Sequence, residues 1–177
     1  MLLNPPVAMA VVTSAAAGLR AEERGATVLQ LRAPLLTTRE LERECRELLR
    51  RARVSVVVSS RCDVALACGA AGVNLPQRDI SVADARTLLG EGLVGRSVHS
   101  IQAAEVAARE GADYVILGPI WESPSHPRGA PLGREALKLG VSAVKIPVLA
   151  IGGVDSARAA LCLEAGAAGY AAIRMFS

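Results

Sequence analysis

The chain repeats a short pattern in which a Gly-Ala pair comes just before an apolar strand. The pattern occurs at Gly25-Ala26, Gly69-Ala70, Gly111-Ala112 and Gly166-Ala167, before apolar residues 28–31, 73–75, 114–117 and 170–173. Glycine supplies the left-handed φ that a helix C-terminus needs, and alanine lets the helix pack closely on a sheet. Each pair therefore predicts a helix that ends as a strand begins.

Four further apolar runs, at 7–14, 54–60, 93–100 and 146–153, lie between these strands. Clear helices are expected at 38–53, with Thr37 or Thr38 as its cap, and at 81–89, 101–110, 134–144 and 155–165. The strands are continuous apolar runs, which is typical of parallel strands covered on both faces. Eight strands alternating with helices favour one (β/α)8 TIM barrel domain over residues 1–177. An open doubly wound sheet is the alternative.

The length of 177 residues suits one domain but is short for this barrel, which typically takes about 250. The first helix has to fit between Ala15 and Arg24. The sequence stops at Ser177, just after the eighth strand, so an eighth helix is expected to be missing. Its absence would expose apolar strand surface, which predicts a homodimer contact or a loosely closed barrel.

Composition excludes several classes of protein. Aromatic residues make up only 2% and the net charge is +3, which argues against nucleic-acid binding. No apolar run approaches the roughly 18 residues of a membrane span. The four cysteines show no Cys-x-x-Cys pairing and neither histidine lies at ligand spacing from them, so no zinc site or disulfide framework is indicated. We expect a cytoplasmic protein with reduced cysteines.

A barrel of this kind places its active site at the C-terminal ends of the strands. The polar residues there include Gln30, Arg32, Ser59, Ser60, Asn74, Asp79, Ser97 and His99. Gly152-Gly153 follows the seventh strand and Ile173-Arg174 the eighth, where their backbone amides would form a phosphate nest. A simple tight turn is the alternative for the Gly-Gly pair.

Several of these residues have two interpretations. His99 is a candidate acid or base if it points inward, and otherwise a packed histidine. His126, in the long loop 121–133, is a second proton-transfer candidate, and Trp121 either lines the site or covers its mouth. Arg32 either reaches an anionic substrate or is a solvated rim residue. Single carboxylates predict little: Asp79 alone makes a poor magnesium site, and Asp63 is better explained as a charge at a helix start.

In order, the strand-end residues resemble the thiamine phosphate synthase superfamily, and within it the TenI-type thiazole tautomerase branch. The resemblance covers nearly the whole chain. It rests on Gln30-Leu-Arg32, Ser60-Arg-Cys-Asp-Val-Ala-Leu66, Gly72-Val-Asn-Leu-Pro76, Val94-Gly-Arg-Ser-Val-His-Ser100, Gly111-Ala-Asp-Tyr-Val115, Gly118-Pro-Ile-Trp121, Ala130-Pro-Leu-Gly133, Ile146-Pro-Val-Leu-Ala-Ile-Gly-Gly153 and Ala165-Gly-Ala-Ala-Gly169.

The resemblance implies a thiazole phosphate ligand, with its phosphate on the amides of Gly152, Gly153, Ile173 and Arg174. Substrate contacts are expected from Gln30, Arg32, Ser59, Ser60, Asn74 and Ser97. The synthase joins this ligand to hydroxymethylpyrimidine pyrophosphate, releases pyrophosphate and uses Mg2+. Here the family's first lysine is replaced by Pro34, its Asn-Asp pair by Ser59-Ser60 and a second lysine by His126.

These losses favour a thiazole tautomerase-like isomerase, which handles no pyrophosphate and needs one positioned acid or base but no cofactor. The tautomerase's own histidine aligns with Pro119, so His126 or His99 would have to replace it. Two alternatives remain. One is a thiamine phosphate synthase with Mg2+ and Asp79 as a metal ligand, and the other is a non-catalytic thiazole phosphate-binding protein.

Overall fold

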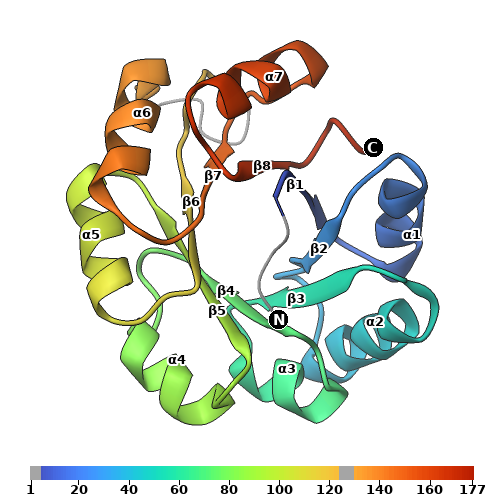
Figure 1. Cartoon of the computed structure of the whole chain (residues 1–177). Helices are drawn as coiled ribbons and strands as arrows, with labels where there is room; N and C mark the ends of the chain where they lie inside the picture. Colours follow the sequence, from blue (N-terminus) through green and yellow to red (C-terminus); the bar gives the residue numbers. More distant parts are fainter. Residues whose placement is uncertain (1–4, 124–129) are drawn as a thin grey trace.

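The computed structural model describes residues 5–123 and 130–177. Over these residues eight parallel strands close into a barrel in sequential order, and the seven helices between them surround it (Figure 1). This confirms the TIM barrel and excludes the open sheet. The elements are β1 (Val7–Val12), α1 (Ala15–Glu23), β2 (Val28–Leu31), α2 (Thr38–Arg51), β3 (Ser55–Ser59), α3 (Cys62–Cys68), β4 (Gly72–Leu75), α4 (Val82–Leu89), β5 (Leu93–Val98), α5 (Ile101–Arg109), β6 (Tyr114–Leu117), α6 (Gly133–Ala143), β7 (Val148–Ile151), α7 (Ser156–Glu164) and β8 (Gly169–Ala172).

Helix boundaries follow local chemistry. Thr37 caps α2 and forms a capping box with Glu40, so the N-cap is Thr37 and not Thr38. The Gly-Ala pairs lie just beyond helix ends, and their glycines, Gly25, Gly69, Gly111 and Gly166, all have φ between 74 and 91°. A Cβ built on the first three would meet no atom within 4 Å. Backbone conformation, not space, therefore requires glycine at those three positions.

The core has two layers. Inside the barrel lies one cluster of buried side chains, contributed by Val7, Met9, Val28, Val57, Leu93, Tyr114, Ile116, Leu149 and Ala171. A larger cluster fills the space between the strands and the helices. Because the strands are covered on both faces, their sequences show no polar alternation. A Cβ on Gly95 would collide with the Tyr114 ring, so the interior leaves no room for a larger residue there.

The barrel closes between β1 and β8, which pair from Val7↔Gly169 to Ala10↔Ala172. The prediction of a short first helix is confirmed, and no helix follows β8 before Ser177. The expectation of a loosely closed barrel is wrong. Phe176 is buried in the outer core, and the guanidinium of Arg24, at the end of α1, donates to the Phe176 carbonyl at 3.1 Å. The C-terminal segment thus lies beside α1 (Figure 1).

On the outer face of β1, Ala8, Ala10 and Val12 are all buried, so this strand exposes no apolar surface. The homodimer stays a prediction. Cys45, Cys62, Cys68 and Cys162 are all free thiols. Among the described helices, none has the length and apolar character needed to cross a membrane.

Candidate active site

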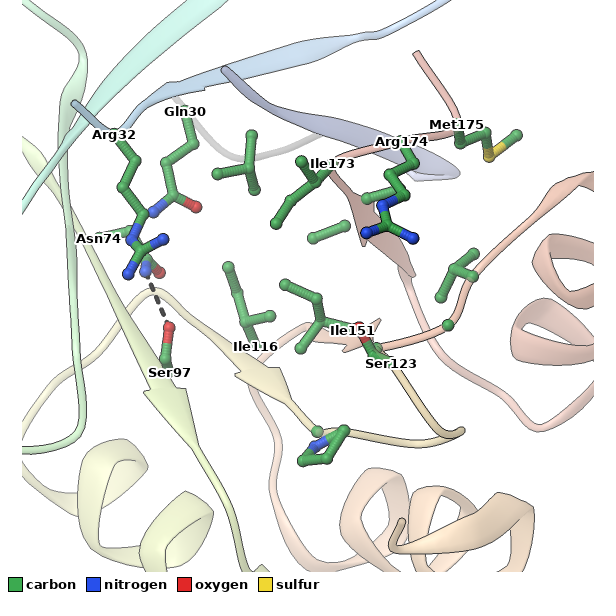
Figure 2. Close-up of a pocket in the computed structure, with 18 of the residues that line it drawn as sticks. Gln30, Arg32, Asn74, Ser97, Ile116, Ser123, Ile151, Ile173, Arg174 and Met175 are labelled. Carbon is green, nitrogen blue, oxygen red and sulfur yellow. Dashed lines mark hydrogen bonds between the residues drawn. The ribbon is translucent and has the colours of Figure 1, made fainter. Parts of the chain in front are cut away.

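A cavity of about 570 Å³ opens at the C-terminal ends of the strands, where the barrel architecture predicts the active site. Every strand contributes to its lining. The predicted site residues that line it are Gln30, Arg32, Ser59, Asn74, Ser97, His99, Gly152, Gly153, Ile173 and Arg174. Most of the site anticipated from strand ends is therefore brought together in one place (Figure 2).

The wall formed by β2, β4 and β5 carries buried amides. Gln30 and Asn74 are only 4% and 1% exposed. The Asn74 side-chain nitrogen donates to the Ser97 hydroxyl at 3.0 Å, as the dashed line in Figure 2 marks. The buried Asn74 Oδ1 has no hydrogen-bond partner among the described residues. Because an unpaired buried acceptor is costly, this wall is suited to a ligand that carries a hydrogen-bond donor.

Arg32 lies on the same wall and is exposed (Figure 2). Its guanidinium forms no ion pair or hydrogen bond with the described residues. Arg174 follows β8 on another side of the cavity, and its guanidinium likewise has no partner in the described part of the chain. Two guanidinium groups without a partner in the described ranges make the cavity attractive to anions.

Gly152 and Gly153 follow β7 with φ of +96° and +66°. The Ile151 carbonyl accepts from Ile120 N at 2.8 Å, and the Gly152 carbonyl accepts from Trp121 N at 3.1 Å. In a trans peptide the N–H points opposite to the C=O. The amides of Gly152 and Gly153 are therefore directed away from the 120–121 segment.

These two amides, and those of Ile173 and Arg174, donate to no acceptor among the described residues. A Cβ at Gly153 would lie 2.6 Å from the Glu122 carbonyl oxygen, so the turn itself also requires glycine. The tight turn and the phosphate nest are thus compatible interpretations of the same residues.

His99 lies at the exposed rim of the cavity. Its backbone N–H donates to Gln77 Oε1 at 2.8 Å, and its ring Nδ1 lies 2.5 Å from the Gly118 carbonyl oxygen. A carbonyl can only accept, so Nδ1 carries a proton, and Nε2 is the basic nitrogen of the neutral ring. The packed-histidine alternative does not fit this exposed position. The other proton-transfer candidate, His126, lies outside the described residues.

Ser60 and Asp79 do not line the cavity. The Ser60 hydroxyl donates to the Asp79 carboxylate, whose second oxygen accepts from Ile80 N at 2.8 Å. Ser60 has a φ of 70°, so the chain turns sharply just after Ser59. This turn separates two neighbours that the sequence analysis placed in the same substrate site.

The region around Asp79 does not fit a magnesium site built by the protein alone. It offers a single carboxylate whose oxygens already accept hydrogen bonds. The Arg96 guanidinium donates to the nearby carbonyls of Gln77 and Ile80, at 3.1 and 2.6 Å. Within the described ranges, no group of three His, Cys, Asp or Glu side chains could hold a metal ion.

Three further residues are Arg158, Trp121 and Asp63, and only Arg158 lines the cavity. Strand-end reasoning missed Arg158 because it lies in the first turn of a helix. Trp121 is half-buried, packs against the outer core and does not line the cavity. Asp63 lies in the first turn of α3 as expected. The hydrogen bond from Arg61 lowers the pKa of its carboxyl.

A model of the family described as thiamine monophosphate synthase matches residues 8–176. The chain belongs to this family. A thiamine-phosphate synthase of Chloroflexus aurantiacus is 44% identical over 153 residues, which cover 84% of this chain and 71% of that protein. A putative thiamine-phosphate synthase 2 of Aquifex aeolicus is 36% identical over 157 residues, 87% of this chain and 84% of its own.

Among solved structures, the thiamine phosphate pyrophosphorylase from Pyrococcus furiosus superposes with a TM-score of 0.88 at 31% identity. The match covers 98% of this chain and 89% of that one. Membership of the thiamine monophosphate synthase family places the chain among the enzymes of thiamine biosynthesis. None of these similarities points to the tautomerase branch.

Proposed function

We propose that this chain is a thiamine-phosphate synthase, which joins a thiazole phosphate to hydroxymethylpyrimidine pyrophosphate and releases pyrophosphate. The observation that carries the proposal is the 44% identity to a protein of that name over 84% of the chain. The synthase therefore replaces the tautomerase-like isomerase as the preferred function. None of the similarities described above supports the isomerase, and Pro119 stands where the resemblance implies the tautomerase's histidine.

The cavity offers groups for both substrates. The amides of Gly152, Gly153, Ile173 and Arg174, which donate to no acceptor among the described residues, bind the phosphate of the thiazole together with the Arg174 guanidinium. Backbone N–H groups and a guanidinium suit a phosphomonoester. On the opposite wall, Asn74 Oδ1, which has no partner among the described residues, accepts a hydrogen bond from the pyrimidine substrate, and Gln30, buried on the same wall, orients the ring.

Departure of pyrophosphate builds up negative charge, which positioned cations stabilise. The lysines that the resemblance implies are replaced by Pro34 and His126. Of the described residues, the cations that line the cavity are Arg32, Arg158 and Arg174. Arg32 is the one on the pyrimidine wall, so we assign it to the pyrophosphate.

The test is to incubate the protein with thiazole phosphate and hydroxymethylpyrimidine pyrophosphate, with Mg2+ and with EDTA. Released pyrophosphate and thiamine phosphate are measured. Equal amounts of both products support the synthase. Absence of both products in each condition, with isomerisation of a carboxythiazole phosphate by the same sample, would overturn it.

One observation keeps the isomerase as a second candidate. His99 lies at the cavity rim, and the bond of its Nδ1 to the Gly118 carbonyl makes Nε2 the nitrogen that can accept a proton in the neutral ring. If NMR detects isomerisation, His99→Gln should reduce its rate by at least about a hundredfold, the usual contribution of a general base. An unchanged rate would exclude His99. Binding of thiazole phosphate without either reaction would favour the non-catalytic binding protein.

A further inference from the structure

Arg158 makes three contacts at the Gly-Gly turn. Its Nη1 donates to the Gly153 carbonyl at 2.7 Å, and its guanidinium lies over the Trp121 ring, 5.4 Å from the centroid. It also forms a loose ion pair with Asp155, with the closest atoms 4.0 Å apart. Asp155 caps α7 by accepting from the backbone N–H of Arg158 itself. The guanidinium thus links the segment after β6, the turn after β7 and the start of α7.

The contact of Arg158 with the Gly153 carbonyl fixes the direction of a third amide. The carbonyls of Ile151 and Gly152 are held by Ile120 and Trp121, and Arg158 holds the next carbonyl, that of Gly153. Each trans peptide points its N–H away from its C=O. Hydrogen bonds to the three preceding carbonyls therefore orient three successive amides, those of Gly152, Gly153 and Val154.

A charged donor does more than orient a peptide. A hydrogen bond from a guanidinium is stronger than one from a neutral group, and it polarises the peptide, so the N–H at the other end becomes a better donor. The ion pair with Asp155 does little to neutralise Arg158, because it is long and the Asp155 side chain is 62% exposed. The positive charge therefore acts on the turn.

We propose that Arg158 is a positioning residue of the phosphate site, which aims and polarises the amides of residues 152–154 toward a phosphomonoester through its hydrogen bond to the Gly153 carbonyl. The inference rests on the proposed function only in the identity of that phosphomonoester. The Trp121 ring holds the guanidinium in place through a cation–π contact. Sequence patterns alone offer no sign of this role, since an arginine in a first helical turn is normally an exposed residue.

The test compares wild type with Arg158→Gln and Arg158→Lys, and uses inorganic phosphate as the probe in calorimetric titrations. Loss of one charge-assisted hydrogen bond predicts about tenfold weaker phosphate binding in Arg158→Gln. Lysine can still donate to the Gly153 carbonyl, so Arg158→Lys should recover part of the affinity. Arg50→Gln is the matched control, because Arg50 is exposed and pairs only with Glu47 on α2.

A second readout separates positioning from general stability. Binding of the dephosphorylated thiazole alcohol should be the same in wild type and Arg158→Gln, because that ligand makes no use of the amides. Trp121→Leu should weaken phosphate binding less than Arg158→Gln, and the double variant should be no weaker than Arg158→Gln, since both changes act through one guanidinium. Thermal unfolding of each variant verifies that it is folded.

Two results would overturn the inference: equal phosphate affinity in wild type and Arg158→Gln, or equal losses for phosphate and the alcohol. A wild type that binds no phosphate overturns it as well. The synthase proposal is judged separately by formation of thiamine phosphate. A chain that binds phosphate through this turn but forms no product would retain the role of Arg158 and lose the synthase.

Discussion

Arg32 and Arg174 follow β2 and β8, the two strands that flank β1 in the barrel. If the two substrates bind as proposed, replacing each arginine weakens the binding of a different substrate. Arg174→Gln should raise the KM for thiazole phosphate about tenfold, and Arg32→Gln should raise that for the pyrimidine pyrophosphate by a similar factor, since each loses one charge-assisted contact. Steady-state kinetics with each substrate varied in turn will show this. Equal effects of both variants on both substrates would contradict the assignment.

Tyr114 is fully buried inside the barrel, and its hydroxyl has no hydrogen-bond partner among the described residues. Burial raises the pKa of this hydroxyl, which stays protonated. Removing an unpaired buried hydroxyl relieves its desolvation cost, so Tyr114→Phe should raise the free energy of unfolding by about 1 kcal/mol. Urea denaturation measures this change.

Gly95→Ala is the matched comparison, because its Cβ would collide with the same ring and should destabilise the barrel. A less stable Tyr114→Phe protein would mean that the hydroxyl has a partner after all.

At the scale of elements, the Gly-Ala junctions make a distinct prediction. Gly111 has a φ of +91° and open space around it, so the penalty for a side chain there is purely conformational. Gly111→Ala should lower the free energy of unfolding by about 1 kcal/mol, and Gly111→Asn by less, since asparagine tolerates the left-handed region. Chemical denaturation of both variants tests the order. An alanine variant as stable as wild type would refute the backbone explanation.

The same junctions explain how far the sequence predicted the fold. Strand order and helix ends depend on local signals, such as Gly111 after α5 and Ser100 before it, so they are visible in one sequence. The turn at Ser60, which directs its hydroxyl to Asp79, depends on a contact between residues far apart in the chain. The carbonyl held by Arg158 depends likewise on the packing of α7 on the β7 turn. Such contacts have no period or motif, and the sequence analysis missed them.

For the whole molecule, buried thiols predict a loss of stability at alkaline pH. Burial raises the pKa of Cys45 to about 12 and that of Cys162 to about 11, from an ordinary value of 9.0. In the unfolded chain these thiols ionise near pH 9, whereas in the folded protein they remain neutral. The contribution of the two neutral thiols to the free energy of unfolding is therefore complete below pH 9, and it is lost as the pH rises toward 11 and 12.

Urea denaturation at pH 7.5, 9 and 10.5 should show a falling free energy of unfolding. The fall should be shallower in Cys45→Ala and Cys162→Ala, whatever their stability at pH 7.5. Identical slopes in all three proteins would show that other groups cause the alkaline loss.

Closure of the barrel also has a consequence for ligand binding. The segment that carries the Ile173 and Arg174 amides also carries Phe176, which is buried in the outer core and accepts a hydrogen bond from Arg24 at the end of α1. A phosphate bound to those amides would hold this segment in place, and anything that binds only the folded state stabilises it. Backbone amides of residues 173–177 should then exchange hydrogen more slowly when phosphate is present. Occupying the active site would therefore stabilise the contact between the last segment of the chain and α1.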